Sequence, residues 1–465
     1  MDGNDGYDKT DLESILEYAS RLTGRTMREF LGDPEDDVIG GVSSKGTFGQ
    51  LVEEGYFHIE NNSRPEPDFS EVGLELKVVP VKKVRGGFVS KERTVLNIIN
   101  YGEALVDGFG TFTHKSSHVM FVFYLWEPDV SIYDYRVLKV VEWVPEGEEL
   151  RLIHDDWDII EGYIARGEAH LLSERHTKYL SACTKGVGHG KDMVQQPMSD
   201  IPAKRRALSL KQSFMTTMFE EYSDIGSRKT IESGYGSLFQ GEWPVGMGFE
   251  RYVLDHFQRF VGMDCATIES KIGYSPNDAN KAYYSNLVMA MLGSPGKKHI
   301  RELVQADVYV KTIRLMSNGK PKESMSFPSF KYEEVAVQEW DESEFHDQVE
   351  RRFLFPVFAF DGGVDVGRRS LRFLGAFFWS PSDQDLETME SVWYDTRNNI
   401  LEGCMDGFTR ISDRKLVHVR PHGRNSHDTY PWRGRQYVKR CFWFNDAYVR
   451  SIVEGNLYGP DSTRR

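Results

Sequence analysis

The fold and the chemistry of this chain are both indicated by one stretch, Pro67-Asp68-Phe69-Ser70-Glu71-Val72-Gly73-Leu74-Glu75-Leu76-Lys77-Val78-Val79-Pro80. From Leu74 onward, apolar residues alternate with others, which is typical of a β-strand. Glu75 and Lys77 should therefore point to the same face. If Asp68 enters from the preceding turn, two carboxylates meet there, and close carboxylates repel each other unless a positive charge lies between them. The stretch thus favours a Mg²⁺ site completed by waters and phosphate oxygens, against the simpler alternative of an exposed Glu–Lys strand.

The composition indicates a cytoplasmic protein of two domains. With 465 residues the chain is too long for one ordinary core. No apolar run reaches membrane-spanning length, and the N-terminus lacks the layout of a secretion signal. The four cysteines lie far apart without a Cys-x-x-Cys motif, which argues against a structural zinc site or a disulfide framework.

The net charge of −14 is unfavourable for a nucleic-acid-binding protein. Binding requires only a local basic face, however, because screened electrostatic attraction acts over short distances. Basic residues cluster at 82–85, 204–206 and 433–440. Each cluster is either a solvated surface or a DNA contact.

The pattern of apolar residues predicts an α/β chain. Helices are expected over 11–30, over the segment from Phe48 to Tyr56 that carries Glu53, and over 146–165. Strands are expected at 118–125, just after Lys115, and at 135–141, and a strand followed by a helix at 206–222. Residues 95–99 suit a short strand or the start of a buried helix. The Gly-rich loop 184–190 lacks Gly-Lys-Ser/Thr, so it is not interpreted as a nucleotide-binding P-loop.

Sequence blocks of the first half recur in the same order in the second half. Trp143-Val144-Pro145 returns as Trp379-Ser380-Pro381, and Asp156-Trp157-Asp158 returns as Val392-Trp393-Tyr394. The order is kept and the offset stays near half the chain. We infer a tandem duplication with domains at 1–223 and 243–465 and a linker at 224–242.

The duplication provides an internal control on the acidic site. The counterparts of Asp68, Glu75, Lys77 and Glu53 are, in that order, Glu302, Tyr309, Lys311 and Met289. The phenol of Tyr309 is a poor Mg²⁺ ligand near neutral pH, and the thioether of Met289 is too soft for a hard cation. The second domain should therefore keep the fold and lack the chemistry.

These residues resemble the MutH nuclease family. The matching blocks are Lys45-Gly46-x-x-Gly49-Gln50-Leu51-x-Glu53, Pro67-Asp68-Phe69, Gly73-Leu74-Glu75-Leu76-Lys77, Asp156-Trp157, Tyr179-Leu180 and Leu210-Lys211-x-x-Phe214. With its degenerate second copy, the whole chain is similar to the tandem GATC-cutting restriction endonucleases of the Sau-three-A type.

The resemblance implies a restriction-endonuclease-like α/β fold, with a mixed sheet flanked by helices and duplicated in tandem. It also implies a type II endonuclease of a restriction-modification system that cuts double-stranded DNA at GATC with Mg²⁺. By the same resemblance, Asp68, Glu75 and Glu53 match acidic metal-site residues, Lys77 matches the lysine of the catalytic signature, and Lys115 falls on a further active-site lysine.

The resemblance also indicates DNA contacts. Lys185 falls in the family's base-reading loop, although Cys183 and Thr184 stand where MutH has an arginine and a proline. Ser209 stands where MutH has a tyrosine near DNA, so methylation sensitivity does not carry over. Two further DNA contacts are predicted: Lys211, from the matching block at 210–214, and Arg420, from the basic loop 420–424 of the second half.

The role of the second domain stays open at this level. It could be an inert remnant, a mimic of a dimer partner, or a DNA-binding domain that binds a second site and regulates the first, which is the hypothesis we favour. A DNA-induced dimer is a further arrangement. A MutH-like nicking repair nuclease and a non-catalytic DNA-binding protein are the alternative functions.

Overall fold

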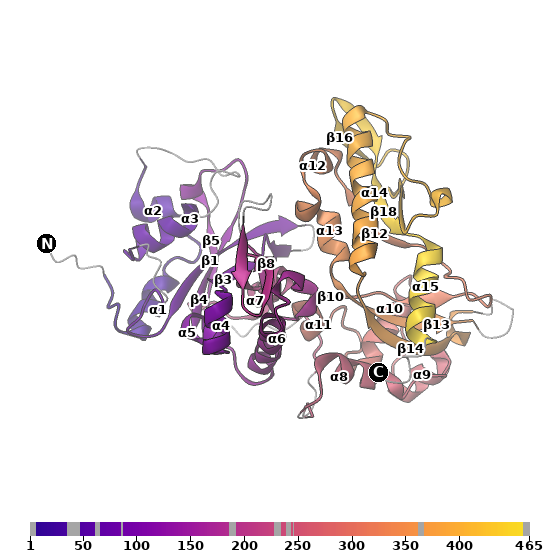
Figure 1. The fold of residues 1–465 in the computed structure, drawn as a ribbon, viewed down its shortest axis with the longest axis horizontal. Coiled ribbons are helices and arrows are strands. Elements are labelled where there is room, and N and C mark those ends of the chain that lie inside the picture. The colour runs from indigo at the N-terminus through magenta and orange to yellow at the C-terminus, as the bar shows by residue number, and fades with distance from the viewer. Residues whose placement is uncertain are drawn as a thin grey trace. The chain divides into compact units, whose positions relative to one another are not determined.

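The computed structural model describes residues 6–34, 47–60, 66–84, 87–185, 192–226, 234–238, 243–244, 246–360 and 367–458. The chain divides into two compact units (Figure 1). The first contains Met1–Gly234 together with Arg301–Asp307, and the second contains Tyr235–Ile300 and Val308–Arg465. Much of the predicted linker 224–242 lies outside the described residues, and the predicted domain boundaries stay a prediction.

The first unit is built on a four-stranded mixed sheet. Its strands, in spatial order, are β2 (Gly87–Ser90), β1 (Glu75–Val84), β4 (Val119–Leu125) and β5 (Val137–Trp143). β1 and β4 run parallel, and the other neighbours are antiparallel. Residues 119–123 of β4 are fully buried, which explains why this strand reads as a continuous apolar run.

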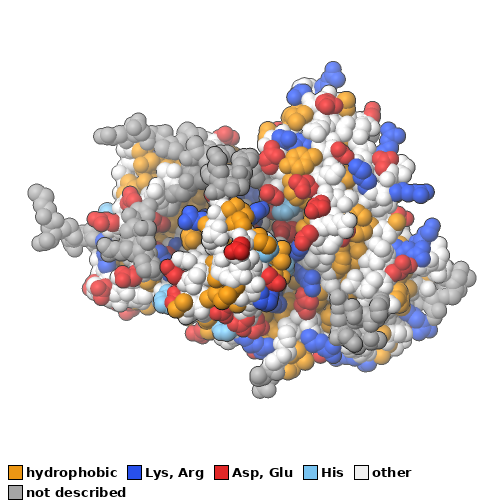
Figure 2. Space-filling model, viewed as in Figure 1, with side chains coloured by type: hydrophobic (Ala, Val, Ile, Leu, Met, Phe, Trp, Pro, Cys, Tyr) orange, Lys and Arg blue, Asp and Glu red, His pale blue; other side chains and the backbone are white. Residues whose placement is uncertain are grey.

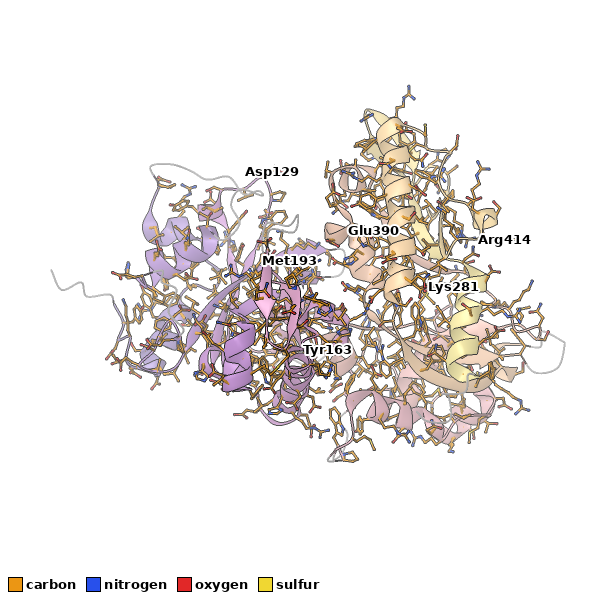
Figure 3. All side chains as sticks on the ribbon, in the orientation of Figure 1. Asp129, Tyr163, Met193, Lys281, Glu390 and Arg414 are labelled. Atoms are coloured by element: carbon orange, nitrogen blue, oxygen red, sulfur yellow. The ribbon has the colours of Figure 1, made fainter. Side chains whose placement is uncertain are left out.

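A second, antiparallel sheet in this unit has the order β3 (Thr94–Ile98), β9 (Arg206–Leu210) and β6 (Leu180–Thr184). The segment at 95–99 is therefore a strand rather than a helix. The hairpin of β7 (Met193–Gln196) and β8 (Ser199–Lys204) follows β6 along the chain. Met193 lies exposed on its first strand (Figure 3).

Helices cover these sheets. They are α1 (Leu12–Ser20), α2 (Met27–Leu31), α3 (Thr47–Gln50), the π-helical η2 (Leu51–Tyr56), α4 (Tyr101–Asp107), α5 (Gly110–Ser116), α6 (Gly147–Ala165), α7 (Gln212–Glu221) and α11 (Arg301–Gln305), with short 3₁₀ turns at Ile132–Asp134, Ala169–Leu171 and Glu174–His176. The predicted helix over 11–30 is wrong as a single element. It is divided into α1 and α2 by a turn in which Gly24 has a φ of 82°.

The second unit repeats this plan. Its mixed sheet contains β10 (Val308–Val310), β11 (Ile313–Leu315), β13 (Arg352–Ala359) and β14 (Arg372–Trp379), and its antiparallel sheet contains β12 (Met325–Phe330), β18 (Arg440–Phe444) and β15 (Val417–Pro421). β16 (Thr429–Trp432) and β17 (Arg435–Val438) form the hairpin. The helices are α8 (Phe249–Gln258), α9 (Cys265–Ile272), α10 (Tyr283–Met291), α12 (Tyr332–Val337), α13 (Glu344–Val349), α14 (Asp383–Glu402) and α15 (Asp446–Leu457), with 3₁₀ turns at Trp340–Glu342, Arg368–Ser370 and Ile411–Asp413.

The second unit has its own core. Side chains of α12, α14 and α15 pack with those of β12, β13, β15 and β18 into one hydrophobic cluster. The long helix α14, labelled in Figure 1, contacts α12 and β15. Lys281, the counterpart of Lys45, is exposed ahead of α10 (Figure 3).

Strand pairing shows the duplication directly. Glu75 lies opposite Val119 in the parallel pair of the first unit, and Tyr309 lies opposite Phe353 in that of the second. In both pairs the partner is 44 residues further along the chain. The predicted α/β fold in tandem duplication is confirmed.

The surface and the cysteines are unexceptional for such a protein. Figure 2 shows Lys and Arg side chains scattered among Asp and Glu over the face in view. Cys183, Cys265 and Cys441 are buried, Cys404 is exposed, and all four are free thiols. Among the described helices, none combines the length and the apolar character that crossing a membrane requires.

Candidate active site

The candidate site is centred on Glu75, the first residue of β1. Its backbone N–H donates to the carbonyl of His118 at 3.0 Å, which ties the start of β1 to β4. Leu74 and Leu76 on either side are fully buried, and Glu75 itself is only 1% exposed. The strand therefore holds a carboxylate inside the protein, where a charge is stable only beside compensating groups.

A tight turn brings Asp68 back to Glu75. Phe69 and Leu74 bond to each other through their backbones, and Gly73 closes the turn with a φ of 67°. The Oδ2 atom of Asp68 accepts the Leu76 N–H at 2.9 Å, and the Asp68 N–H donates to Oε2 of Glu75 at 3.3 Å. The two acids predicted from sequence to meet are thus neighbours.

Two lysines contact Glu75 at the same oxygen. The Lys77 amino group, two residues further along β1, donates to Oε1 of Glu75. The Lys115 amino group lies 3.5 Å from that atom and comes from the last turn of α5. Both lysine side chains are about a fifth exposed, at 23% and 20%, so the cluster opens to solvent on the lysine side.

Glu53 approaches from η2. Val52 and Tyr56 of η2 pack in the same core as Leu74 and Leu76, which fixes this helix against β1. Burial raises the pKa of Glu53, and the charge of Asp68 raises it further while Lys77 opposes the shift. Glu53 therefore lies within electrostatic range of the cluster. The Lys45-Gly46 part of its sequence block falls outside the described residues.

The acidic residues are crowded electrostatically. Burial raises the pKa of Glu75, Lys77 opposes this shift, and the negative charge of Asp68 adds to it. The pKa values of Glu53 and Glu75 are thus raised for the same two reasons. Each carboxylate is removed from water, and each lies near the negative charge of Asp68.

The donor set fits the protein's share of a Mg²⁺ site. Mg²⁺ is commonly held by one or two carboxylates, with waters and substrate phosphate in the remaining positions. Asp68 and Glu75 supply two oxygen-donor side chains side by side. A bound cation would relieve the repulsion from Asp68 that raises the pKa values of Glu53 and Glu75. Across the part of the chain that the structure describes, no three acidic, histidine or cysteine side chains form a ready-made metal cage. The fit is therefore to a site of two carboxylates, with Glu53 as a charged neighbour.

The predicted DNA contacts have different environments. Lys185 is exposed at the end of β6, and its N–H bonds to the Arg205 carbonyl at 2.8 Å, while the loop residues 186–191 lie outside the described part. Lys211 is only 8% exposed, and its amino group donates to the Thr177 carbonyl at 2.6 Å. This position disfavours a direct contact between Lys211 and DNA.

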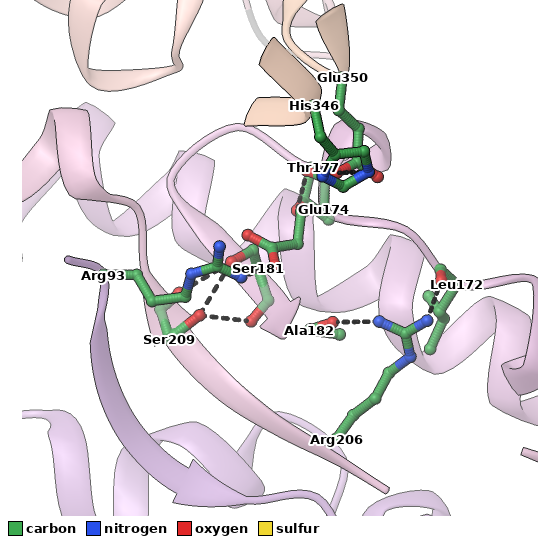
Figure 4. Close-up of polar contacts among 10 residues, drawn as sticks. All are labelled: Arg93, Leu172, Glu174, Thr177, Ser181, Ala182, Arg206, Ser209, His346 and Glu350. Atoms are coloured by element: carbon green, nitrogen blue, oxygen red, sulfur yellow. Dashed lines mark hydrogen bonds and ion pairs between the residues drawn. The ribbon is translucent and has the colours of Figure 1, made fainter. Parts of the chain in front are cut away.

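Ser209 and Arg420 also have clear partners. Ser209 is fully buried and shares a 2.9 Å hydrogen bond with Ser181 across β9 and β6 (Figure 4). In the second unit, the guanidinium of Arg420 lies 3.7 Å from the centre of the Trp443 ring. Arg420 thus lies over an aromatic ring, which fits DNA binding or a purely structural cation–π contact.

The counterparts in the second repeat do not rebuild the acidic cluster. Tyr309 is 40% exposed, and Met289 is buried. Lys311 donates to the Ser326 carbonyl at 3.0 Å, and burial lowers the pKa of this lysine. Glu302 is buried in the first compact unit, as part of Arg301–Asp307.

Sequence reasoning gave no role of its own to Asp156 of α6. This side chain is fully buried and accepts three backbone N–H groups, from Lys178, Tyr179 and Leu180. The sequence shows only an acid directly before a tryptophan. It does not show the hydrogen-bond partners of Asp156, which lie more than twenty residues further along the chain.

Comparison with known proteins agrees with this geometry. The family model described as "DNA mismatch repair enzyme MutH" matches twice, at residues 57–156 and 292–391. The type II restriction enzyme Sau3AI of Staphylococcus aureus is 31% identical, over 92% of this chain and 97% of that enzyme. MutH proteins of Shewanella woodyi and Yersinia enterocolitica are 32% and 27% identical, over 38% and 46% of this chain and 76% and 94% of their own lengths. The chain therefore belongs to the family of the type II restriction enzyme Sau3AI, with two MutH-type domains in tandem.

Proposed function

We propose that this protein is a restriction endonuclease that hydrolyses both strands of DNA at GATC and uses Mg²⁺. One observation carries the proposal: a buried Glu75 at the start of β1 is surrounded by Asp68, Lys77 and Lys115. Similarity to a type II restriction enzyme along 92% of the chain supports restriction over a single-domain repair nuclease. The resemblance to GATC-cutting enzymes supports that recognition site. The enzyme would act in the cytoplasm.

The chemistry follows from the side chains around Glu75. Asp68 and Glu75 would hold the metal ion, which supplies a polarised phosphate oxygen and an acidified water when bound. Lys77 would orient the attacking water and offset negative charge on the phosphoryl oxygens. Lys115, whose amino group lies 3.5 Å from the same oxygen of Glu75, would bind the scissile phosphate. Glu53 would help to orient the carboxylates of Asp68 and Glu75.

Base recognition would come from the segment that follows β6. Lys185 is exposed there and can donate to the O6/N7 edge of guanine, a contact worth about 1–3 kcal/mol of discrimination. The buried Lys211 is not retained as a base or phosphate contact. It is better explained as a support of the strand that leads to Lys185.

The second unit would bind a second DNA site and regulate the first. Support comes from the basic residues of its β15–β18 region, where the Arg420 guanidinium lies over the Trp443 ring and Arg433 and Arg435 are exposed. Cutting of a two-site plasmid should be faster than that of a one-site plasmid, and a short GATC duplex added in trans should accelerate the one-site substrate. Equal rates without any response to the duplex would reject this regulation.

A digest of mapped DNA tests the main proposal. The purified full-length protein is incubated with Mg²⁺ or with EDTA, and the product ends are sequenced. Double-strand breaks at GATC that require Mg²⁺ and vanish in Glu75→Gln are expected. Nicks in one strand would favour the repair-type nuclease, and DNA binding without any cutting would favour a non-catalytic protein.

A further inference from the structure

Asp156 anchors the beginning of β6. Its Oδ2 atom accepts the N–H groups of Tyr179 at 2.6 Å and Leu180 at 3.0 Å, and Oδ1 accepts that of Lys178 at 2.8 Å. The amino group of Lys178 lies 3.5 Å from Oδ1 as well. One fully buried carboxylate of α6 thus fixes three consecutive residues at the start of the strand.

A buried lysine completes this anchor from the other strand. Lys211 follows β9, and its amino group donates to the carbonyl of Thr177, directly before the three anchored amides. Its N–H also bonds to the Tyr179 carbonyl at 3.2 Å. Burial raises the pKa of Asp156, whereas Lys178 and Lys211 oppose that shift, so the two lysines compensate the buried charge.

The anchor lies five residues before the segment that would meet DNA. β6 pairs with β9 from Leu180 to Thr184, and Lys185 follows at its end. Because both strands are hydrogen-bonded along this length, a displacement at Tyr179 and Leu180 is passed on to Lys185. Buried polar contacts of β6 with Ser209 and Arg206 (Figure 4) stiffen the same strand.

The second repeat forms the same strand pair with a different anchor, one that has no buried acid. The side chain of Asn445 donates to the carbonyls of Lys415 at 3.2 Å and Ile411 at 3.4 Å, and the Lys415 amino group lies 3.0 Å from the carboxylate of Asp395, which is 51% exposed. There β15 pairs with β18, and the N–H of Asn445 bonds to the Leu416 carbonyl where Lys211 bonds to Tyr179. The sequence repeat places Val392 at the position of Asp156 and leaves the neighbouring tryptophan, Trp393, fully buried like Trp157. The fold therefore does not require a buried acid and lysine at this place.

We propose that Asp156, with Lys211, is a positioning residue for base recognition, which holds β6 so that Lys185 meets the base edge at a fixed depth. This inference rests on the proposed function, because it needs Lys185 to read bases. A carboxylate suits the task since its two oxygens can accept all three N–H groups, whereas an amide in its place offers a single acceptor oxygen.

The test compares cutting of GATC with cutting of duplexes that differ by one base pair. We expect Asp156→Asn to lower the ratio of the two rates at least about tenfold, because a good base contact discriminates by roughly that factor or more. Asp158→Asn is the matched control on the same helix, since that side chain is 57% exposed, and it should keep the wild-type ratio.

A second variant covers the case in which Asp156→Asn does not fold. The double exchange Asp156→Val with Lys211→Asn copies the pair of the second repeat and leaves no buried charge unpaired. It should fold and also lose discrimination. A wild-type ratio in either folded variant overturns the inference, and so does failure of both variants to fold, since the pair would then be purely structural. A wild-type protein that does not discriminate at all overturns the proposed function instead.

Discussion

Glu75 and Tyr309 occupy the same position in two equivalent pairs of parallel strands. Glu75 lies opposite Val119, and Tyr309 lies opposite Phe353. The first is buried among Asp68, Lys77 and Lys115, and the second is 40% exposed with an aromatic neighbour in Phe353. The same strand pair can thus carry a buried acid or an exposed phenol without a change of register.

Glu75→Gln should lower the cleavage rate by at least about 10²–10³, because it removes the buried negative charge that the metal ion needs. Single-turnover cutting of a GATC duplex measures this. Tyr309→Phe is the matched change at the equivalent position and should leave the rate unchanged. A rate loss in Tyr309→Phe as large as that in Glu75→Gln would contradict the assignment of all cleavage to the first unit.

The two lysines at Glu75 should differ in effect. Lys77 donates directly to Glu75, so Lys77→Met should reduce the cleavage rate by about 10² or more. Lys115 lies 3.5 Å from the same oxygen, and Lys115→Met should reduce the rate by about 10–10². Lys82→Met, on an exposed position of the same strand, is the control. A rate like that of the control in Lys77→Met would remove Lys77 from the mechanism.

Variants of Lys185 and Lys211 should distinguish a lysine that contacts DNA from one that supports the strand. Lys185→Ala should weaken discrimination of the guanine position about tenfold to a hundredfold without a change in melting temperature, because its side chain is exposed. Lys211→Met should destabilise the protein by about 1–3 kcal/mol, since the Thr177 carbonyl loses its buried donor, and it should also lower discrimination because β6 is held less firmly. Thermal melting and cutting of variant duplexes give both readouts. Loss of discrimination in Lys211→Met with an unchanged melting temperature would restore Lys211 as a DNA contact.

The second unit should lose stability as the pH falls through the range of histidine. His418 is 1% exposed, and among the described residues its ring nitrogens find no hydrogen-bond partner. Burial, together with the nearby charge of Arg420, lowers its pKa from 6.5 to about 4. Between pH 6.5 and about pH 4, His418 is therefore protonated in the unfolded chain but neutral in the folded chain. Stability should be full above pH 6.5 and should decrease toward pH 4, by about 3 kcal/mol at most.

Thermal melting of the full-length protein at pH 7.5 and pH 5 checks this dependence. His418→Leu should flatten the pH dependence of the transition that belongs to the second unit. His427→Gln, at an exposed position, should leave it as in the wild type. An unchanged slope in His418→Leu would show that another group titrates.

Local sequence was sufficient for the elements that carry the chemistry. The alternation around Glu75 predicted β1, and the repeat predicted a second unit with Tyr309 at the equivalent position. The helix over 11–30 failed because apolar spacing alone does not register a turn at Gly24, whose backbone leaves the helical region.

The sequence by itself determined the duplicated α/β plan, the acid–lysine pattern of Glu75 and Lys77, and its loss in the second copy, because strand periodicity and residue chemistry are local properties. Only the tertiary structure decided that Lys211 is buried, that Asp156 binds the amides of β6, and that Arg301–Asp307 belongs to the first compact unit. Burial and hydrogen-bond partners depend on which distant segments pack together, and a single sequence does not state that.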